Sequence, residues 1–154
     1  MTGERFTLDA NILFYSIDNA AGVRQAMARR IIDMSLACDC WLTLQSVSEF
    51  YAAATRKGRM PIEDAAAQAI DWLDLFPMIA ASATAIRSAL LVASSRRASY
   101  WDALLVATAA EGGCRTILTE DLADGTTPGG VRVLNPFGDI DLTEAALRLL
   151  SRPH

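Results

Sequence analysis

Four carboxylic acids stand out by their positions along the 154-residue chain. Asp9 follows a short apolar run, and Asp102 lies at the start of an otherwise apolar stretch. Glu49 lies among residues that look buried, and Asp121 falls in a segment rich in Asp and Gly. The only histidine, His154, is the last residue, where chain ends are usually frayed. A nucleophile activated by histidine is therefore not expected, and hydrolytic chemistry would depend on carboxylates and metals.

Each acid also has an ordinary structural interpretation. Asp9 is suited to cap the helix that follows it, and Asp102 would interact favourably with the dipole of its own helix. Asp121 is suited to a turn. Glu49 is harder to explain, because it lies inside a helix with no Lys or Arg three or four residues away. A buried carboxylate without a partner is costly, and its pKa shifts instead.

The four acids have a common explanation if the fold brings them together. Two unit charges about 5 Å apart repel each other by roughly 3 kcal/mol at an effective dielectric constant of about 20. These acids would not remain ionised together without a cation. A hard dication such as Mg²⁺ takes carboxylate oxygens, water and substrate phosphate as ligands. Such an ion lowers the pKa of bound water and holds the attacking and leaving oxygens of an in-line phosphoryl displacement.

Short strands and helices alternate along the chain and must position these acids. Runs typical of β-strands are residues 6–8, 41–44, 78–79, 116–119 and 131–134. Helices are predicted over residues 10–17, 23–35, 45–55, 61–75, 101–111 and 142–150, and over a segment capped by Ser82 or Thr84 that ends at Ser94. This alternation implies an α/β fold with a parallel sheet covered on both faces. Ligands bind such sheets at the carboxyl ends of the strands, and Asp9 and Asp121 follow the first and fourth strands.

The basic residues are almost all arginine. Of the 14 Lys and Arg residues, only Lys57 is not an arginine, and the net charge of −4 argues against a simple electrostatic nucleic-acid binder. The planar guanidinium group nevertheless suits two-point contacts with phosphate. Arginines gather in residues 24–30, 56–59 and 96–97. Solvated helix faces are the ordinary interpretation, and we also expect these clusters to flank a phosphate-bearing ligand along the acidic edge of the sheet.

Length and hydropathy predict one soluble domain over residues 1–154. The longest charge-free run, residues 75–86, has 12 residues, whereas a membrane span needs about 20. No signal peptide is expected before the first strand, which favours a cytoplasmic location. We expect Cys38, Cys40 and Cys114 to be reduced small hydrophobes, because their spacing is not that of a zinc site.

Five segments resemble a known family in their order and spacing. They are FTLDANILFY, LQSVSEFYAAATRKG, SYWDALLVATAAEGGC, TILTEDLADG and VRVLNPF, and they extend from Phe6 to Phe137. Together they resemble PIN-domain nucleases, most closely the VapC-type toxins of bacterial toxin–antitoxin pairs. In that family one Asp ends the first strand, a Glu lies in the helix after the second strand, and two Asp lie before and after the fourth strand. The resemblance places these metal-binding and catalytic roles on Asp9, Glu49, Asp102 and Asp121.

The resemblance implies a three-layer α/β/α fold with a central parallel sheet of four to five strands. It also implies a nuclease that uses Mg²⁺ or Mn²⁺ to cut RNA, leaving 5′-phosphate and 3′-hydroxyl ends. Asn11 and Thr119 match polar positions beside the metal, and Asp124 is either an accessory acid or a turn residue beside Gly125. The implied partners are a small antitoxin and a second copy of the chain, as a homodimer that becomes a heterotetramer or larger with antitoxin.

Other functions remain open on the sequence. A phospho-accepting receiver domain would need a lysine after the last strand, where Asn135 and Pro136 stand instead. An aspartyl phosphatase would need a second Asp at position 11, and a dinucleotide site would need glycines there. A non-catalytic acidic pocket is left as one alternative, which metal titration would separate. An RNA-processing nuclease without a toxin role is the other.

Overall fold

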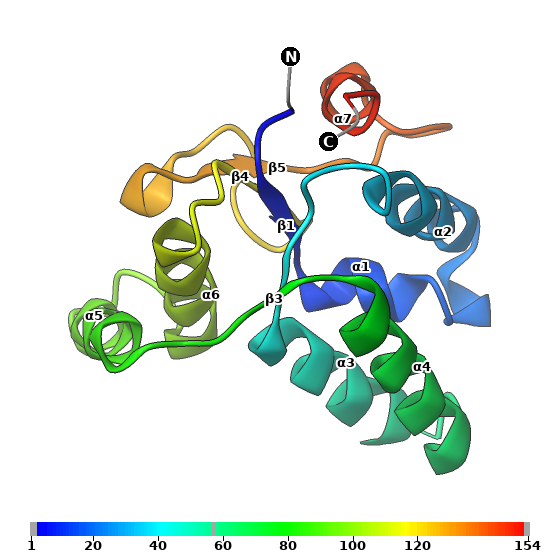
Figure 1. Cartoon of the computed structure of the whole chain (residues 1–154), viewed down its shortest axis with the longest axis horizontal. Coiled ribbons are helices and arrows are strands. Elements are labelled where there is room, and N and C mark those ends of the chain that lie inside the picture. Colours follow the sequence, from blue (N-terminus) through cyan, green and yellow to red (C-terminus); the bar gives the residue numbers. More distant parts are fainter. Residues whose placement is uncertain (1–2, 57, 153–154) are drawn as a thin grey trace.

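Short parallel strands form the centre of the molecule (Figure 1), and the described residues contain five of them. The structure is a computed structural model that describes residues 3–56 and 58–152, so Lys57 and His154 lie outside it. Strand β1 (Phe6–Leu8) pairs with β4 (Thr116–Leu118), and β4 pairs with β5 (Arg132–Leu134). The pair β2 (Leu42–Thr43) and β3 (Met78–Ile79) forms a second small sheet.

The two sheets meet through one β-bridge between Phe6 and Cys40. The backbone N–H of Phe6 donates to the Asp39 carbonyl at 3.2 Å, and the N–H of Trp41 donates to the Phe6 carbonyl at 3.0 Å. The strands therefore follow the order β3-β2-β1-β4-β5. The predicted parallel sheet is confirmed, although it divides into three strands and two.

Helices cover both faces of these strands. The helices are α1 (Ala10–Tyr15), α2 (Val23–Ser35), α3 (Leu44–Arg56), α4 (Ile62–Leu75), α5 (Ala83–Ser94), α6 (Tyr100–Glu111) and α7 (Glu144–Leu150), with 3₁₀ turns η1 (Asn19–Ala21) and η2 (Pro128–Gly130). In Figure 1, α5 and α6 lie on one side of the strands, and α1 to α4 and α7 lie on the other. This arrangement confirms the predicted three-layer α/β/α architecture.

Local capping explains where several helices begin. The hydroxyl of Ser82 accepts a hydrogen bond from the Ala85 N–H and so caps α5, which decides between Ser82 and Thr84. Ser99 caps α6. Several predicted boundaries were wrong. Residue 44 belongs to α3 rather than to a strand, and α1 ends at Tyr15 rather than at residue 17. Thr143 caps α7, which therefore begins two residues later than predicted.

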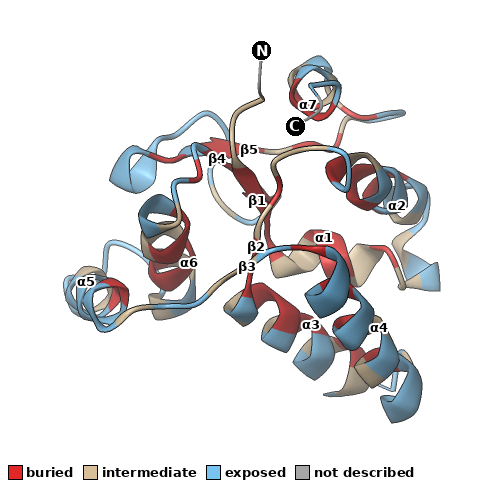
Figure 2. Ribbon diagram, viewed as in Figure 1, coloured by how far each residue is buried: buried red, intermediate tan, exposed pale blue. Residues whose placement is uncertain are grey.

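The core lies on both sides of the strands, which are buried along most of their length (Figure 2). On the larger side, the Phe50 and Trp72 rings pack edge to face at 4.6 Å and join α3 to α4. On the other side, Leu105 of α6 packs with Ile117 of β4, while Leu104 packs with α5. Helix α6 lies between the sheet and α5, which explains why apolar residues occur on more than one of its faces.

The structure also tests the expectations about the cysteines and about membrane-spanning helices. All three cysteines are free; Cys40 and Cys114 are buried and Cys38 is half-buried. Burial raises the pKa of each thiol, to about 11 for Cys114, so these groups behave as the expected small hydrophobes. Within residues 3–56 and 58–152, none of the helices has the length and hydrophobicity needed to cross a membrane.

The fully buried hydroxyl of Thr7 generates a stability prediction. Its Oγ1 has no hydrogen-bond partner among the described residues, whereas the equally buried Thr116 hydroxyl donates to Glu4 Oε2 at 3.3 Å. Thr7→Val should raise the free energy of unfolding by about 1 kcal/mol, because an unsatisfied buried polar group is removed without a change of shape. The matched control Thr116→Val should not stabilise. Urea unfolding measures both, and a destabilised Thr7→Val would contradict the prediction.

Candidate active site

Asp9 stands where β1 ends and α1 begins, and only 7% of it is exposed. One carboxylate oxygen accepts a hydrogen bond from the Ala10 N–H at 2.7 Å, so Asp9 caps α1. The other oxygen accepts a hydrogen bond from the Thr119 hydroxyl at 2.8 Å. The capping interpretation and the site interpretation are therefore compatible, because each uses a different oxygen.

The Thr119 hydroxyl connects this carboxylate to the end of β4. Besides donating to Asp9, Thr119 Oγ1 accepts from Asn11 Nδ2 at 3.2 Å and from the Asp121 N–H at 3.1 Å. The Thr119 side chain is fully buried. Three of the predicted site residues and the backbone of a fourth thus meet around one oxygen atom, at the carboxyl edge of the sheet.

The electrostatic environment of Asp9 places two further acids nearby. Burial raises the pKa of Asp9 from its ordinary value of 3.8 to about 6. The hydrogen bonds from Thr119 and Ala10 oppose this rise, and the negative charges of Asp121 and Glu49 add to it. The carboxylates of Asp121 and Glu49 are therefore close enough to act on Asp9.

Glu49 and Asp121 face a common cavity of about 340 Å³. The cavity lies between α1, α3 and the segment after β4, and its lining includes Asn11 and Arg56. Glu49 is half-buried, and its Oε1 accepts a hydrogen bond from Gln45 Nε2 at 2.7 Å. Gln45 is a neutral amide four residues earlier on the same helix. Only Lys and Arg were considered at this spacing in the sequence, so this partner was not identified there.

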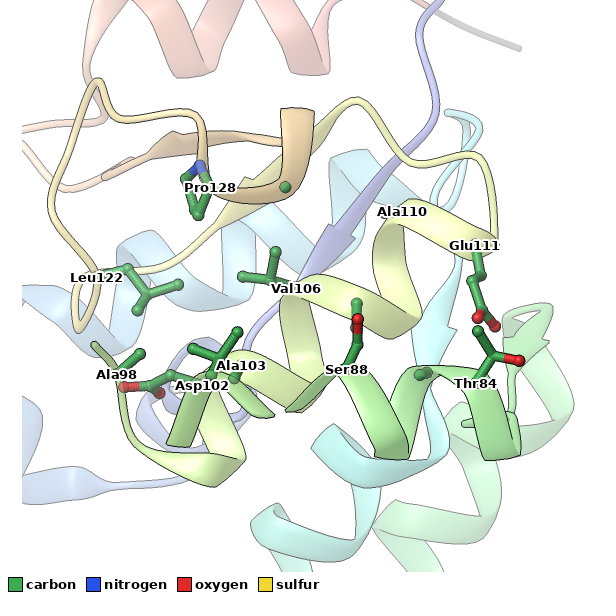
Figure 3. Close-up of a pocket in the computed structure, with 14 residues that line it drawn as sticks. Thr84, Ser88, Ala98, Asp102, Ala103, Val106, Ala110, Glu111, Leu122 and Pro128 are labelled. Atoms are coloured by element: carbon green, nitrogen blue, oxygen red, sulfur yellow. The ribbon is translucent and has the colours of Figure 1, made fainter. Parts of the chain in front are cut away.

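Asp102 lies at the margin of this group. It is in the first turn of α6 and is half-buried, and its charge is not among those that shift the pKa of Asp9. It lines a different, apolar cavity of about 370 Å³ between α5, α6 and the segment 122–129. Figure 3 shows Asp102 at one end of that cavity, near Ala98 and Leu122. Gln45 connects the two regions, because its Nε2 also donates to the Trp101 carbonyl at 2.9 Å.

Asp124 serves the turn after β4. Its exposed carboxylate accepts a hydrogen bond from the Asn135 N–H at 2.8 Å, which ties the turn to the end of β5. Gly125 follows with φ +81, a backbone conformation that favours glycine. The structure therefore gives Asp124 the turn role that the sequence left open beside the accessory role.

A neighbouring acid, Glu120, was not singled out by the sequence reasoning. Tyr15 donates its phenolic hydrogen to Glu120 Oε1, and Arg24 Nε donates to Oε2 at 2.9 Å. Burial and the Glu120 carboxylate together raise the pKa of Tyr15 to about 12. The Arg24 guanidinium also lies 5.6 Å from the Phe137 ring centroid. Both oxygens of Glu120 are thus engaged by Tyr15 and Arg24, and no sequence spacing indicates this network.

The donor set is chemically suited to a hard cation. Apart from the Asn11 amide, it consists of carboxylates, and Asn11 Oδ1 is buried with no hydrogen-bond partner among the described residues. An oxygen acceptor left open beside carboxylates fits Mg²⁺, which binds few carboxylates and keeps several waters. In residues 3–56 and 58–152, no three His, Cys, Asp or Glu side chains already stand at metal-binding separations. Water and a substrate phosphate would have to complete the coordination.

Comparisons with known proteins agree with this geometry. Solved structures similar to this chain include the Mycobacterium tuberculosis toxin VapC20, which cleaves the sarcin-ricin loop (TM-score 0.59, 18% identity, 75% of this chain and 91% of that one). Two DNA-bound complexes are also similar, VapBC2 of Rickettsia felis (TM-score 0.60, 13% identity) and VapBC of Salmonella typhimurium (TM-score 0.61, 15% identity). Each match covers 84% of this chain and 96% of the other chain. Among curated proteins, no sequence matches.

Similarities at this level of identity establish the fold alone. The sequence itself matches the family model of the PIN domain over residues 6–123, which covers most of the chain and includes Asp9, Glu49, Asp102 and Asp121. The chain belongs to the PIN domain family.

Proposed function

We propose that this chain is a metal-dependent endoribonuclease and the toxin of a toxin–antitoxin pair. The observation that carries the proposal is the group formed by buried Asp9, Thr119 and Asn11 at the carboxyl edge of the sheet, with Asp121 and Glu49 close enough to act on Asp9. A buried carboxylate with a raised pKa next to other acids is typical of functional sites. The fold shared with VapC20 and the VapBC complexes supports the same assignment.

Asp9, Glu49, Asp102 and Asp121 would hold Mg²⁺ or Mn²⁺, with Asn11 Oδ1 as a further oxygen near the ion. When bound, the ion lowers the pKa of water and neutralises charge on a phosphodiester. Thr119 and the Ala10 N–H keep the Asp9 oxygens in place. Gln45 orients Glu49 relative to the first turn of α6. Preorganised side chains of this kind reduce the rearrangement needed when substrate arrives.

The arginines make different contributions than the sequence suggested. Arg24 and Arg30 bind Glu120 and Asp141, and Arg29 donates to the Ser16 carbonyl, so the first cluster mainly stabilises structure. Arg56 lines the cavity that contains Glu49 and Asp121 and is exposed. We propose that Arg56 contacts a phosphate of the RNA, because the acids themselves repel it.

Partners and organisation follow from the toxin assignment. We propose that residues 1–154 form one nuclease domain that meets its RNA in the cytoplasm. A small antitoxin would bind the chain and block its site, and two copies would form a homodimer that becomes a heterotetramer or larger with antitoxin. The DNA-bound VapBC complexes support the antitoxin partner by analogy of fold.

One other candidate function has an observation in its favour. Since the described residues contain no preformed metal cluster, a non-catalytic acidic pocket is the second candidate. Titration with Mn²⁺ distinguishes the two, because a metal site should raise the melting temperature of the wild type and have little effect on Asp9→Asn. A melting temperature that ignores Mn²⁺ would favour the pocket.

Cleavage of RNA is the direct test of the nuclease. Incubation of the wild type with total cellular RNA and Mn²⁺ should create new 5′-phosphate ends, which sequencing maps. Asp9→Asn and Asp102→Asn should each reduce cleavage at least about 100-fold, and Thr119→Val about 10- to 100-fold, as is typical of a group that orients a ligand. The turn residue Asp124 provides the matched control, Asp124→Asn. Full cleavage in excess EDTA, or by both Asp9→Asn and Asp102→Asn, would refute the assignment.

The raised pKa of Asp9 predicts a pH dependence of stability in the presence of chelator. Unfolded Asp9 ionises near 3.8 and native Asp9 near 6, so the native state binds more protons between these values. Stability should therefore decrease as pH rises from about 4 to about 6, by up to roughly 3 kcal/mol from this residue. Above pH 6, Mn²⁺ should restore stability.

The measurement is the difference in unfolding free energy between the wild type and Asp9→Asn at pH 4, 5, 6 and 7. Asp9→Asn should become the relatively more stable protein as the pH rises, because an amide does not ionise. Asp124→Asn is again the control and should show no such trend. A pH-independent difference between wild type and Asp9→Asn would show that the native carboxyl titrates normally.

Toxicity is tested in cells. Induced expression of the wild type should arrest bacterial growth, whereas Asp102→Asn, which leaves the Asp9 hydrogen bonds intact, should not. Co-expression of a small reading frame adjacent to the gene should restore growth. A chain that cleaves RNA in solution but leaves growth unaffected would instead belong to RNA processing.

A further inference from the structure

Trp101 is the most exposed of the three tryptophans, with 59% of its surface accessible. Trp72 is buried against Phe50, and the half-buried Trp41 lies beneath the Arg5 guanidinium, 4.5 Å from its ring centroid. Trp101 belongs to none of the buried hydrophobic clusters of the described residues. Packing of the core therefore does not explain why a tryptophan stands at this position.

The first turn of α6 lies at the same edge of the sheet as Asp9. The other end of α6 is at the opposite edge, because the Gly112 carbonyl accepts a hydrogen bond from Arg5, which precedes β1. Trp101 is one helical turn before Leu105, which packs against Ile117 of β4. Side chains four residues apart share a face of a helix, and they tilt toward its N-terminus. Trp101 thus continues the sheet-facing side of α6 beyond the end of the strands.

The position of Trp101 is fixed relative to the candidate acids. Its ring packs edge to face against Tyr100, with centroids 5.0 Å apart and an interplanar angle of 72°. Its carbonyl accepts a hydrogen bond from Gln45, and the same amide nitrogen binds Glu49. Asp102 is the next residue along the chain. A rigid aromatic surface beside the site loses little conformational entropy when a ligand stacks on it.

Cations are available in the turn that leads into α6. Arg96 and Arg97 are exposed, and neither forms an ion pair with another described residue. In contrast, Arg24, Arg30 and Arg59 are paired with carboxylates. A polyanion that approaches the acidic group would find positive charge at this turn. It would also find an aromatic surface there.

We infer that the first turn of α6 binds single-stranded RNA, with one base stacked on Trp101 and neighbouring phosphates on Arg96 and Arg97. This inference rests on the proposed nuclease function and specifies its substrate class. Stacking on an aromatic side chain requires an unpaired base, because bases inside a duplex are already stacked. Stacking is also tolerant of sequence, since every base has a π-face. The acids repel phosphate, so affinity has to come from groups beside them.

Binding is tested separately from cleavage. The probe is a short fluorescein-labelled oligouridylate, titrated by anisotropy into the full chain carrying Asp9→Asn, so that the RNA is not cut. Adding Trp101→Ala should weaken binding about 5- to 150-fold, the range expected for loss of one stacked base. Adding Trp101→Phe should retain most of the affinity, because an aromatic face remains. The matched control is Trp41→Phe, which should not change binding.

Two further measurements sharpen the result. Intrinsic fluorescence should be quenched by the unlabelled oligouridylate, and Trp101→Phe should remove that quenching while Trp41→Phe preserves it. In the otherwise wild-type chain with Mn²⁺, Trp101→Ala should raise KM for a single-stranded substrate and leave kcat nearly unchanged. Circular dichroism melting verifies that each variant is folded.

Several outcomes would overturn the inference. Unchanged RNA affinity of Trp101→Ala is one, and equal dependence on Trp101 for a duplex probe is another. A third is that Trp101→Ala dissociates a dimer at unchanged RNA affinity, which would make Trp101 a contact between copies. The proposed function fails independently, if the wild type with Mn²⁺ leaves all RNA intact. Binding through Trp101 would then belong to an RNA-binding module.

Discussion

A buried negative charge that the fold must hold at the end of β1 is the constraint on which the site depends. Asp9 is almost inaccessible to water, and no cationic side chain of residues 3–56 and 58–152 replaces its hydration. Among the residues that the structure describes, only the Ala10 N–H and the Thr119 hydroxyl donate hydrogen bonds to its oxygens. The resulting pKa near 6 shows that these two hydrogen bonds compensate only in part. The native chain therefore retains an unfavourable ionised group, as is typical of sites where stability is exchanged for function.

The edge of the sheet was predictable from sequence because strand ends in α/β folds are marked locally. The strand-like run before Asp9 and the run 116–119 located β1 and β4 in the sequence, and parallel pairing makes the ends of these strands neighbours. Ser82 was one of two candidate caps predicted for the helix that ends at Ser94, and it does cap α5. The boundary between β2 and α3 was missed, because the apolar Leu44 is equally compatible with strand and helix.

Features that depend on long-range contacts could not be predicted. The ion pair of Arg24 with Glu120 joins residues 96 positions apart, so arginine clustering alone overstated the free positive charge. The neutral partner of Glu49 was hidden because Gln45 is unremarkable in sequence. Asp102 lines a different cavity from Glu49 and Asp121, which its position in the sequence does not indicate. In each case the side-chain rotamer and the tertiary packing decide the outcome, not the local pattern.

The contact between the three-stranded and two-stranded sheets helps to set the distances between the carboxylates. Asp9 and Asp121 follow strands of the three-stranded sheet. Glu49 lies on α3, which follows β2 of the two-stranded sheet. Within the described residues one bridge at Phe6 joins the two sheets, and apolar packing between α1 and α3 adds to this connection. Changes of volume at Leu13 or Phe50 would shift one carboxylate relative to the others without altering any polar group. Packing of the hydrophobic core thus determines how far apart the carboxylates lie.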